Sequence, residues 1–231
     1  MLDILRTGLT ALGLDAAKAE TLSAFAERVL ERNRVMDLTA ITDPADFARL
    51  HLLDSAALLT VADFGGRRVV DVGTGAGFPG VPLRILQEDM RLTLLDSTAK
   101  RVAFLEESCA ALGLTGVDCV CARAEAFAAR EREAFDLAVS RAVAAMPVLC
   151  ELCLPLVRVG GRFIAMKSTR SDEELSAARR AIETLGGRVE RVADYAIPGS
   201  GVIHRAVVVE KVRPTPAMYP RQFGQIKKKP L

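Results

Sequence analysis

The chain has 231 residues, 50% of them hydrophobic and 26% charged, with a formal net charge of +2. A chain of this length and composition can bury a sizeable core, which excludes an intrinsically disordered protein. No stretch approaches the length of a membrane span, and the first residues carry early charge without a sustained apolar run. We therefore expect no membrane anchor and no export signal, and we place the protein in the cytoplasm.

The positive charge is concentrated at the carboxyl end. Residues 1–210 carry 25 basic and 29 acidic residues, a net charge of −4. Residues 211–231 carry no acidic residue and six basic ones, namely Lys211, Arg213, Arg221, Lys227, Lys228 and Lys229. Such an end fits a protein that binds a polyanion, although a solvated terminus has the same composition.

Helices are expected over the first part of the chain. Residues 2–12 fit a short helix, and Asp15 is a candidate N-cap for a longer one that extends to about Asn33. The longer helix has one apolar face at helical spacing, formed by Leu22, Phe25, Ala26, Val29 and Leu30.

A third helix is predicted to begin at Asp43-Pro44 and to end near Leu59, because Asp is a favoured N-cap and Pro a favoured first helical residue. On this helix His51 and Asp54 lie three positions apart, so their side chains could meet on one face. They could form a functional pair or a structural hydrogen bond.

From Arg68 onward, strands alternate with helices, which predicts a parallel sheet covered on both faces. The candidate strands are 68–72, 91–95, 117–121, 137–139 and 162–166. Helices are expected to begin near Val81, Lys100, Glu125, Ala144 and Ser171. The last of these helices has a capping-box pattern at residues 171–174 and is expected to end at Gly186-Gly187.

Residues 188–197 and 202–211 are too close in sequence for a crossover, so they predict an antiparallel hairpin. A parallel sheet that ends in such a hairpin is typical of the methyltransferase form of the doubly wound fold. We therefore predict an α/β protein of the class I S-adenosylmethionine-dependent methyltransferase type with an N-terminal helical extension. We divide it into an extension (1–65) packed on the catalytic domain, a methyltransferase domain (66–212) and a basic C-terminal tail (213–231).

The five cysteines are expected to be reduced and buried. An odd number without an export signal argues against a disulfide framework. Cys150 and Cys153 form a CxxC pair, but no second pair with zinc spacing follows, and His51 and His204 are distant in sequence. We expect no metal site, and small buried side chains at these two positions and at Cys109, Cys119 and Cys121.

The first strand leads into a glycine-rich loop that predicts a nucleotide-type binding site. The strand ends in Asp71-Val72, and Gly73, Gly75 and Gly77 follow, so that backbone N–H groups can approach a ligand at the start of a helix. Residues 75–80 match the G-x-G-x-x-G dinucleotide pattern, which is weak on its own. An acidic side chain here would repel pyrophosphate and could meet the α-ammonium group of a methionine moiety. Alternatively, Asp71 only organises the glycine turn.

Three further strand ends carry polar residues. Asp96 ends the second strand, where a carboxylate can bind both ribose hydroxyls of an adenosine, in NAD and S-adenosylmethionine alike. Ala124 and Glu125 follow the third strand and could flank an adenine ring, or they only begin a helix. Arg141 ends the fourth strand and could contact the cofactor or the incoming substrate, or form a surface salt bridge.

The chemistry favours methyl transfer over hydride transfer. Neither Tyr195 nor Tyr219 is followed four residues later by lysine, and neither histidine lies beside a strand end in the first half of the sheet, so an oxidoreductase would lack a proton donor. Methyl transfer needs mainly alignment and exclusion of water, so we assign no catalytic acid or base. Residues 140–143 replace the Asn/Asp-Pro-Pro-aromatic motif of many amine methyltransferases, and no cysteine is placed to attack a pyrimidine, which favours a ring nitrogen such as guanine N7.

These residues together resemble the bacterial small-subunit ribosomal RNA guanine-N7 methyltransferases of the RsmG family, also called glucose-inhibited division protein B (GidB). The matching stretches cover nearly the whole chain and are residues 38–44, 51–55, 71–83, 94–97, 100–105, 140–142, 219–221 and 228–231. Asp37, where the family usually has asparagine, and Arg32, where an aromatic residue is common, depart from the pattern. Both lie outside the expected pocket and concern the N-terminal helices or RNA contact.

The resemblance implies S-adenosyl-L-methionine as the cofactor and a guanine of 16S ribosomal RNA, near the decoding region, as the methyl acceptor. It implies a small ribosomal subunit or an assembly intermediate as the partner, with no DNA and no membrane, and we expect a monomer. By position, the cofactor contacts fall on Gly73, Phe78, Ala124, Glu125 and Arg141. The alternatives are a methyltransferase of another RNA and a non-catalytic ribosome-binding protein that keeps the cofactor pocket.

Overall fold

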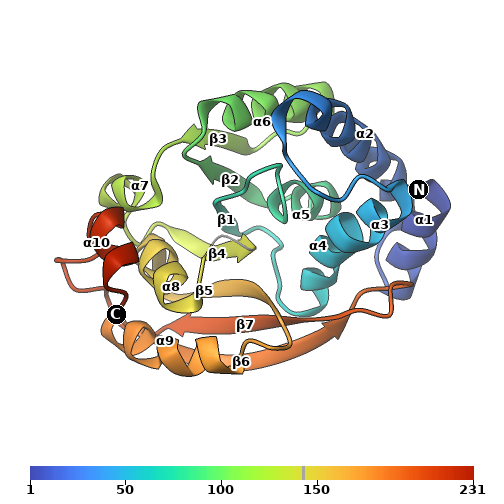
Figure 1. The fold of residues 1–231 in the computed structure, drawn as a ribbon. Coiled ribbons are helices and arrows are strands. Elements are labelled where there is room, and N and C mark those ends of the chain that lie inside the picture. Colours follow the sequence, from blue (N-terminus) through green and yellow to red (C-terminus); the bar gives the residue numbers. More distant parts are fainter. Residues whose placement is uncertain (142–143) are drawn as a thin grey trace.

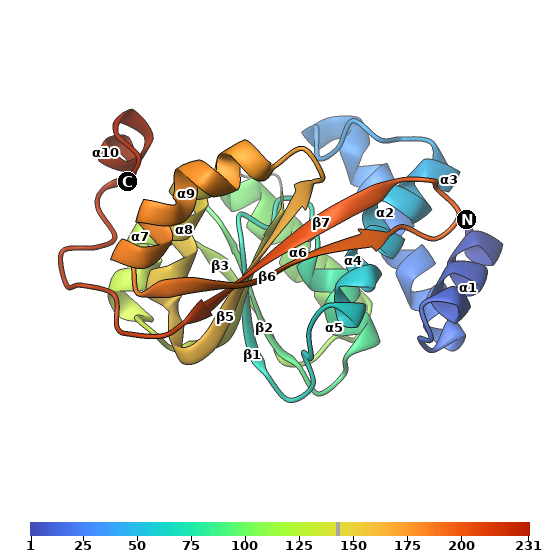
Figure 2. The same cartoon turned by 90° about the horizontal axis from the view of Figure 1, so that it is seen from below.

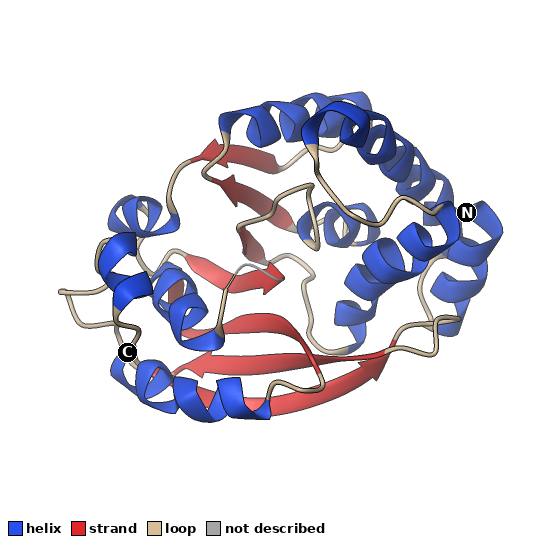
Figure 3. Ribbon diagram, in the orientation of Figure 1, coloured by secondary structure: helices blue, strands red, loops and turns tan. Residues whose placement is uncertain are grey.

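The computed structural model describes residues 1–141 and 144–231. Ala142 and Val143, which belong to the predicted motif after the fourth strand, lie outside the described residues. The described part of the chain contains a seven-stranded sheet in the order β3-β2-β1-β4-β5-β7-β6 (Figures 1 and 3). Its strands are β1 (Arg68–Val72), β2 (Arg91–Asp96), β3 (Val117–Cys121), β4 (Phe135–Arg141), β5 (Val157–Ser168), β6 (Gly187–Ala196) and β7 (Ile203–Lys211).

The sheet has a parallel part and an antiparallel part. Strands β1 to β5 pair in parallel, whereas β7 pairs antiparallel with both β5 and β6. The hairpin of β6 and β7 therefore closes one edge of the sheet, as the short link between residues 196 and 203 requires. This arrangement confirms the predicted α/β class. Strand β5 is longer than predicted because it begins at Val157 and passes through Gly160-Gly161.

Helices precede the sheet and alternate with its strands. The N-terminal helical segments are α1 (Leu2–Ala11), η1 (Ala16–Lys18), α2 (Ala19–Met36), α3 (Pro44–Phe47), η2 (Ala48–Leu53), α4 (Asp54–Ala57) and η3 (Leu58–Thr60). The later ones are α5 (Gly80–Leu86), α6 (Ala99–Ala111), α7 (Ala124–Arg130), α8 (Met146–Cys153), η4 (Leu154–Leu156), α9 (Asp172–Thr184) and α10 (Phe223–Lys228).

The predicted N-caps Asp15 and Asp43 both act as caps. Asp15 Oδ1 accepts the N–H of Ala17 at 2.9 Å, which begins η1 and α2. Asp43 Oδ1 accepts from the N–H groups of Ala45 and Asp46 at 2.9 and 3.0 Å, ahead of Pro44. These bonds satisfy N–H groups that a helix start leaves without partners.

The two faces of the sheet bury separate hydrophobic clusters because successive strand residues point to opposite sides. Val69 belongs to the cluster that contains the N-terminal helices, α5 and α6. Val70 belongs to the cluster that contains α7, α8 and α9. In both views the N-terminal helices and α10 lie at opposite ends of the molecule (Figures 1 and 2).

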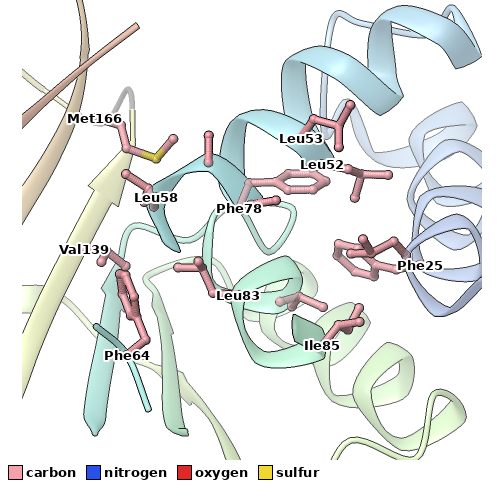
Figure 4. Packing of buried hydrophobic residues seen from close by; sticks show 14 of the residues in the cluster. Phe25, Leu52, Leu53, Leu58, Phe64, Phe78, Leu83, Ile85, Val139 and Met166 are labelled. Carbon is pink, nitrogen blue, oxygen red and sulfur yellow. The ribbon is translucent and has the colours of Figure 1, made fainter. Parts of the chain in front are cut away.

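Aromatic rings join the N-terminal helices to the glycine loop. The ring of Phe78 lies 5.5 Å from that of Phe25 on α2 and 5.7 Å from that of Phe47 on α3. Figure 4 shows Phe78 in the same cluster as Leu52, Leu53 and Phe25. The extension and the loop therefore share one core. A substitution that leaves a cavity in this core would destabilise both of them.

Two local expectations are wrong. Cys121 is exposed and Cys119 is half-buried, whereas Cys109, Cys150 and Cys153 are buried as expected. Strand β3 is the edge strand of the sheet, which leaves one side of its residues uncovered. Within the described residues the Ser171 side chain caps no N–H of α9. Glu174 does not complete the expected capping box but bonds Lys167 Nζ at 2.7 Å.

The basic C-terminal segment is anchored to the protein body by three internal contacts. Lys211 is fully buried, and its Nζ donates to the carbonyls of Leu154 and Val157 at 2.7 and 3.0 Å. Arg213 donates to the carbonyl of Glu183. Arg221 pairs through Nε and Nη2 with the fully buried Glu151 at 2.8 and 2.6 Å. These three charges are used inside the molecule, which corrects the view of the segment as a uniformly free cationic tail.

Candidate functional site

A cavity of about 350 Å³ opens at the carboxyl ends of β1, β2 and β3. This is the edge at which open α/β sheets bind ligands, and the volume lies within the usual range of about 300–1,000 Å³ for ligand pockets. The lining combines apolar side chains with acidic and basic groups and consists of Val72, Gly73, Leu95, Asp96, Ser97, Arg101, Ala122, Arg123, Ala124, Glu125, Arg141, Leu152 and Phe223. Five of the nine predicted cofactor residues are among them.

The remaining predicted residues shape the loop behind this cavity. Asp71 is fully buried, and its Oδ2 accepts from Thr74 Oγ1 at 2.7 Å and from the N–H of Gly80 at 2.8 Å. The carboxylate thus joins the beginning and the end of the glycine loop. This geometry matches the alternative in which Asp71 organises the turn, and the side chain does not line the cavity.

Burial of Asp71 has an electrostatic consequence. Within the described residues its Oδ1 has no hydrogen-bond partner, although it is buried. Desolvation raises the pKa of Asp71 from 3.8 to about 6, against the opposing effect of the bonds from Thr74 and Gly80. The carboxylate is therefore held in the loop at a cost in stability at neutral pH.

The glycines of the loop have two different tasks. Gly73 and Gly75, with φ of 73° and 60°, are partly accessible, and Gly75 donates its N–H to Asp96 Oδ2 at 3.1 Å. Gly77, with φ of 102°, is buried, and a Cβ there would lie 2.9 Å from atoms of Phe25, Leu105 and Val81. Gly73 and Gly75 therefore present backbone near the cavity, whereas Gly77 allows close packing.

Asp96 lies in the position expected of a ribose acceptor. It ends β2, lines the cavity and is mostly buried. Oδ2 accepts the Gly75 N–H and Oδ1 accepts the Thr98 N–H at 2.8 Å. A carboxylate has about four acceptor positions, so this group is oriented by two backbone bonds and keeps the capacity to accept two hydroxyl donors.

The far wall of the cavity brings together two distant parts of the chain. Ala124 and Glu125, at the start of α7, line it as predicted. Opposite them lies Phe223 of α10, and the Arg123 guanidinium carbon is 4.7 Å from the centre of its ring. Sequence reasoning missed Phe223, because no local pattern indicates that the C-terminal segment returns to the sheet.

Arg132 and Arg221 hold Phe223 in place. The Arg132 guanidinium donates to the carbonyls of Thr215 and Tyr219 at 2.6 and 2.7 Å. Two residues before Phe223, Arg221 pairs with the buried Glu151, which also accepts the Arg221 backbone N–H at 2.9 Å. The C-terminal segment therefore forms part of the cavity wall.

Phe78 does not line the cavity. Its ring is buried and stacks on the imidazole of His51, with the centres 4.7 Å apart and the planes at 11°. The Arg141 guanidinium carbon lies 5.0 Å from the centre of the same ring. Phe78 thus supports Arg141, which does line the cavity.

Arg141 connects the sheet to the N-terminal helices. Its Nη1 donates to the Leu50 carbonyl and to Asp54 Oδ2, both at 3.2 Å, and its Nη2 donates to His51 Nδ1 at 2.8 Å. These partners lie in η2, a wider π-type turn, and at the start of α4. Such turns are frequent at functional sites. Arg141 bridges His51 and Asp54, so the predicted pair meets through a third residue.

The hydrogen bonds define the protonation state of His51. Nδ1 accepts from Arg141, so the ring proton lies on Nε2, which is 2.7 Å from Thr39 Oγ1. Desolvation and the neighbouring Arg141 charge lower the pKa of His51 to about 3. The imidazole is therefore neutral at physiological pH and serves to orient Arg141.

A second cavity, of about 570 Å³, lies on the other side of Arg141. It is lined by residues from η2, α4, β4, β5, β7 and two loops, four of them apolar, namely Ile41, Leu50, His51, Asp54, Arg141, Met166, Lys167, Ser168, Val202 and His204. Arg141 is the residue that lines both cavities.

Residues 1–141 and 144–231 contain neither a candidate metal site nor a candidate membrane-spanning helix. Among them, no group of three or more His, Cys, Asp or Glu side chains is placed to hold a metal ion. Nor is any helix in this part of the chain both long and apolar enough to cross a bilayer.

The parallel sheet, its closing hairpin and a cavity at the strand ends define a protein of the class I S-adenosylmethionine-dependent methyltransferase type. The fold is similar to that of a SAM-dependent methyltransferase from Aquifex aeolicus, with a TM-score of 0.55 at 18% identity over 81% of this chain and 98% of that one. It is also similar to M. jannaschii TYW2, solved in complex with AdoMet, with a TM-score of 0.52 at 13% identity over 69% and 75% of the two chains.

The chain belongs to the family described as rRNA small subunit methyltransferase G, whose family model matches residues 18–200. Proteins named "Ribosomal RNA small subunit methyltransferase G" are similar over nearly their whole length. The one from Symbiobacterium thermophilum is 46% identical over 99% of this chain and 97% of its own. The one from Deinococcus radiodurans is 44% identical over 99% and 92%. The chain thus belongs to a family of ribosomal RNA methyltransferases.

The buried Asp71 predicts a pH dependence of stability. Its pKa is higher in the folded protein than in the unfolded chain, so the folded state binds the proton more tightly. The stabilisation that this provides below pH 4 is lost as the pH rises to 6. Between pH 4 and 7, the free energy of unfolding of the wild type should therefore fall by about 2 kcal/mol relative to Asp71→Asn.

Urea unfolding at several pH values measures this difference. A constant offset between the two proteins is expected from the altered hydrogen bonds, so only the change with pH counts. Asp118→Asn, at an exposed position on β3, is the matched control and should follow the wild type. If the free energy of unfolding changes with pH in the same way in the wild type and in Asp71→Asn, the pKa of Asp71 is not raised in the folded protein.

Proposed function

We propose that the chain transfers the methyl group of S-adenosylmethionine to N7 of a guanine in 16S ribosomal RNA. Methylation of small-subunit ribosomal RNA is the activity of the family to which the chain belongs. The observation that carries the proposal is the first cavity, where the acidic end of β2, the backbone of Gly73 and apolar side chains such as Phe223 meet in one site. Guanine N7 has a free lone pair and no proton, which fits a site with no assigned acid or base.

The residues around the first cavity fit an adenosine cofactor with an amino-acid end. In the proposal, Asp96 accepts the ribose hydroxyls, and Ala124 and Glu125 flank the adenine, with Phe223 closing the outer side. Gly73 and Gly75 present backbone to the methionine part, and Arg141 lies at the reacting end. Asp71, Gly77 and Phe78 act indirectly, because their side chains or packing hold the loop and Arg141 in place.

The protein contributes alignment and a dry environment to the reaction. S-adenosylmethionine supplies a methyl group activated by the positive sulfur. Asp96 and the glycine loop fix the position of the donor, and the cavity wall formed by α7 and α10 excludes water. Since no proton leaves N7, the residues of the site need only hold the two reactants in line.

The proposed partner is 16S ribosomal RNA in a small ribosomal subunit or an assembly intermediate. The exposed Lys227, Lys228 and Lys229 lie on the same C-terminal segment as Phe223, so cationic charge flanks the cofactor cavity. We propose that the protein acts in the cytoplasm as a monomer, with no DNA or membrane partner. All the acidic residues expected of a cofactor pocket are present, which disfavours a non-catalytic binding protein.

The proposed reaction predicts a specific nucleoside product. Small-subunit RNA lacking 7-methylguanosine should gain this nucleoside when it is incubated with the protein and S-adenosylmethionine, as measured by mass spectrometry of RNA digests. Large-subunit RNA is the control substrate and should remain unmodified. Equal methylation of both RNAs, or methylation at another atom, would refute the substrate or the acceptor.

The ribose role predicts that Asp96→Ala weakens S-adenosylmethionine binding. Loss of the paired acceptor should cost about 1–3 kcal/mol, which corresponds to a roughly 5- to 150-fold higher Kd. Calorimetric titration measures this change. Asp89→Ala removes an exposed carboxylate near the opposite end of β2 and should bind like the wild type. If Asp96→Ala and the control bind S-adenosylmethionine with equal affinity, Asp96 does not bind the ribose.

The exposed lysines of α10 and its end predict a salt-dependent RNA contact. Replacing Lys227, Lys228 and Lys229 by glutamine should reduce the slope of log K against log salt by up to about 2, since each contact with a single-stranded phosphate contributes about 0.7. Filter binding at several salt concentrations gives the slope. Arg91→Gln, an exposed position at the amino end of β2, should leave the slope unchanged. An unchanged slope in the triple variant would show that these lysines are solvated and do not contact RNA phosphates.

A further inference from the structure

We propose that the second cavity, beyond Arg141, receives the target guanine and that Nε2 of His204 accepts the hydrogen bond from guanine N1–H. In this arrangement N7 points back toward Arg141 and the cofactor cavity. The inference rests on the proposed function, because it assigns the acceptor base of the same reaction to a site. It names His204 as the residue that distinguishes guanine from adenine.

The position of the second cavity fits the acceptor. It lies at the carboxyl ends of β4 and β5, next to the first cavity, and Arg141 lines both. In the sheet β4, β5 and β7 are neighbours in that order, and the register places Arg141 in line with Met166 and Ala206. The backbone of His204 therefore lies two strand spacings, about 10 Å, across the sheet and two residues, about 7 Å, along β7 from that of Arg141. The two side chains turn toward each other and both bond Asp54, so they border one wall of the cavity. A purine that lies along this wall can place one edge near Arg141 and the other near His204 Nε2.

The lining of the cavity fits a base that has left its stack. Leu50, Met166 and Val202 provide apolar surface for the two faces of a ring. A methionine thioether adds a favourable contact with an aromatic face. Enzymes that act on a base in folded nucleic acid use such a pocket together with a few polar groups that bind the base edge. His204 is one of the polar groups at this wall.

His204 is oriented as an acceptor by a buried network. Its Nδ1 lies 2.8 Å from Asp54 Oδ1, which also accepts from Tyr195 Oη at 3.0 Å. Asp54 is buried and is held by Arg141 on its other oxygen. In the neutral imidazole the proton therefore lies on Nδ1, and Nε2 presents a lone pair. This is the arrangement by which a carboxylate fixes a histidine tautomer.

The chemistry of the reaction explains why an acceptor is useful here. The N7 lone pair forms the new bond to the methyl carbon, the carbon–sulfur bond breaks with its electron pair going to sulfur, and the purine ring becomes cationic. The N1–H group becomes more acidic as that charge develops, so its hydrogen bond to Nε2 strengthens in the transition state. Adenine has no hydrogen at N1 and would face the lone pair of His204 with its own.

The inference predicts the direction of a pH dependence. His204 faces Asp54 of α4, Tyr195 of β6, Arg141 of β4, Lys167 of β5 and His51 of η2, all of which contact it or line the same cavity. The hydrogen bond that His204 donates to Asp54 raises the pKa of His204 above 6.5, and His51, with a pKa of about 3, stays neutral in this range. Only the neutral form of His204 accepts N1–H, so kcat/KM should rise with pH through the His204 pKa.

The test compares His204→Phe and His204→Gln with the wild type. Methylation of small-subunit RNA is measured between pH 5.5 and 8.5, with S-adenosylmethionine affinity and thermal unfolding determined on the same samples. His204→Phe should lower kcat/KM by roughly 10- to 100-fold, the effect of losing one hydrogen bond that strengthens with charge. His204→Gln retains an acceptor oxygen and should lose less. In neither variant should kcat/KM rise with pH through the range in which His204 of the wild type loses its proton.

Glu210→Gln, at the other end of β7, is the control and should keep the wild-type rate and pH profile. Both His204 variants should bind S-adenosylmethionine like the wild type, because His204 does not line the first cavity. If His204→Phe unfolds, His204→Gln alone carries the test through its pH profile.

Three results would overturn the inference: wild-type kinetics in both variants, a rate loss explained by weaker cofactor binding, or a wild-type rate that falls as His204 becomes neutral. The last result would instead indicate donation from a protonated His204 to guanine O6. A wild-type protein that methylates no ribosomal RNA would refute the proposed function itself, which is a separate outcome.

Discussion

The structure depends on the buried contact between Arg141 and Asp54. It joins the end of β4 to the N-terminal helices, and the same carboxylate holds His204 and Tyr195 of the closing hairpin. A buried ion pair contributes little net stability, but the loss of one partner is costly because the other charge remains buried. Arg141 is therefore held at the border that the two cavities share. Phe78 and His51, stacked beneath it, restrict it further.

The glycine loop is held by a second constraint, the carboxylate of Asp71. This group closes the loop from Thr74 to Gly80 and is fully buried, although burial raises its pKa to about 6. Burial of this carboxylate thus lowers the stability of the fold but fixes the loop backbone beside the first cavity, as is common at functional sites. The two carboxylates act differently: Asp71 fixes the loop from behind, and Asp96 faces the cavity from the next strand.

The C-terminal segment links the cofactor cavity to the charged end of the chain. Arg132 and Arg221 bind it to the body, and Phe223 becomes part of the cavity wall. Of its six basic residues, Lys211, Arg213 and Arg221 are used internally, whereas Lys227, Lys228 and Lys229 remain exposed. One segment thus supplies part of the wall of the first cavity and, further along, an exposed cationic end.

The sequence by itself determined the order of strands and helices, the closing hairpin and the polar strand ends at Asp96 and Arg141. These features depend on local periodicity, on short links and on turn residues, which the chain carries in adjacent positions. Only the tertiary structure decided that Asp71 and Phe78 face the loop and core, that Cys121 is exposed on an edge strand, and that Phe223 reaches the cavity. The pairs Arg221–Glu151 and His204–Asp54 are 70 and 150 residues apart. No local pattern indicates such partners, because their proximity results from the packing of the whole sheet and its helices.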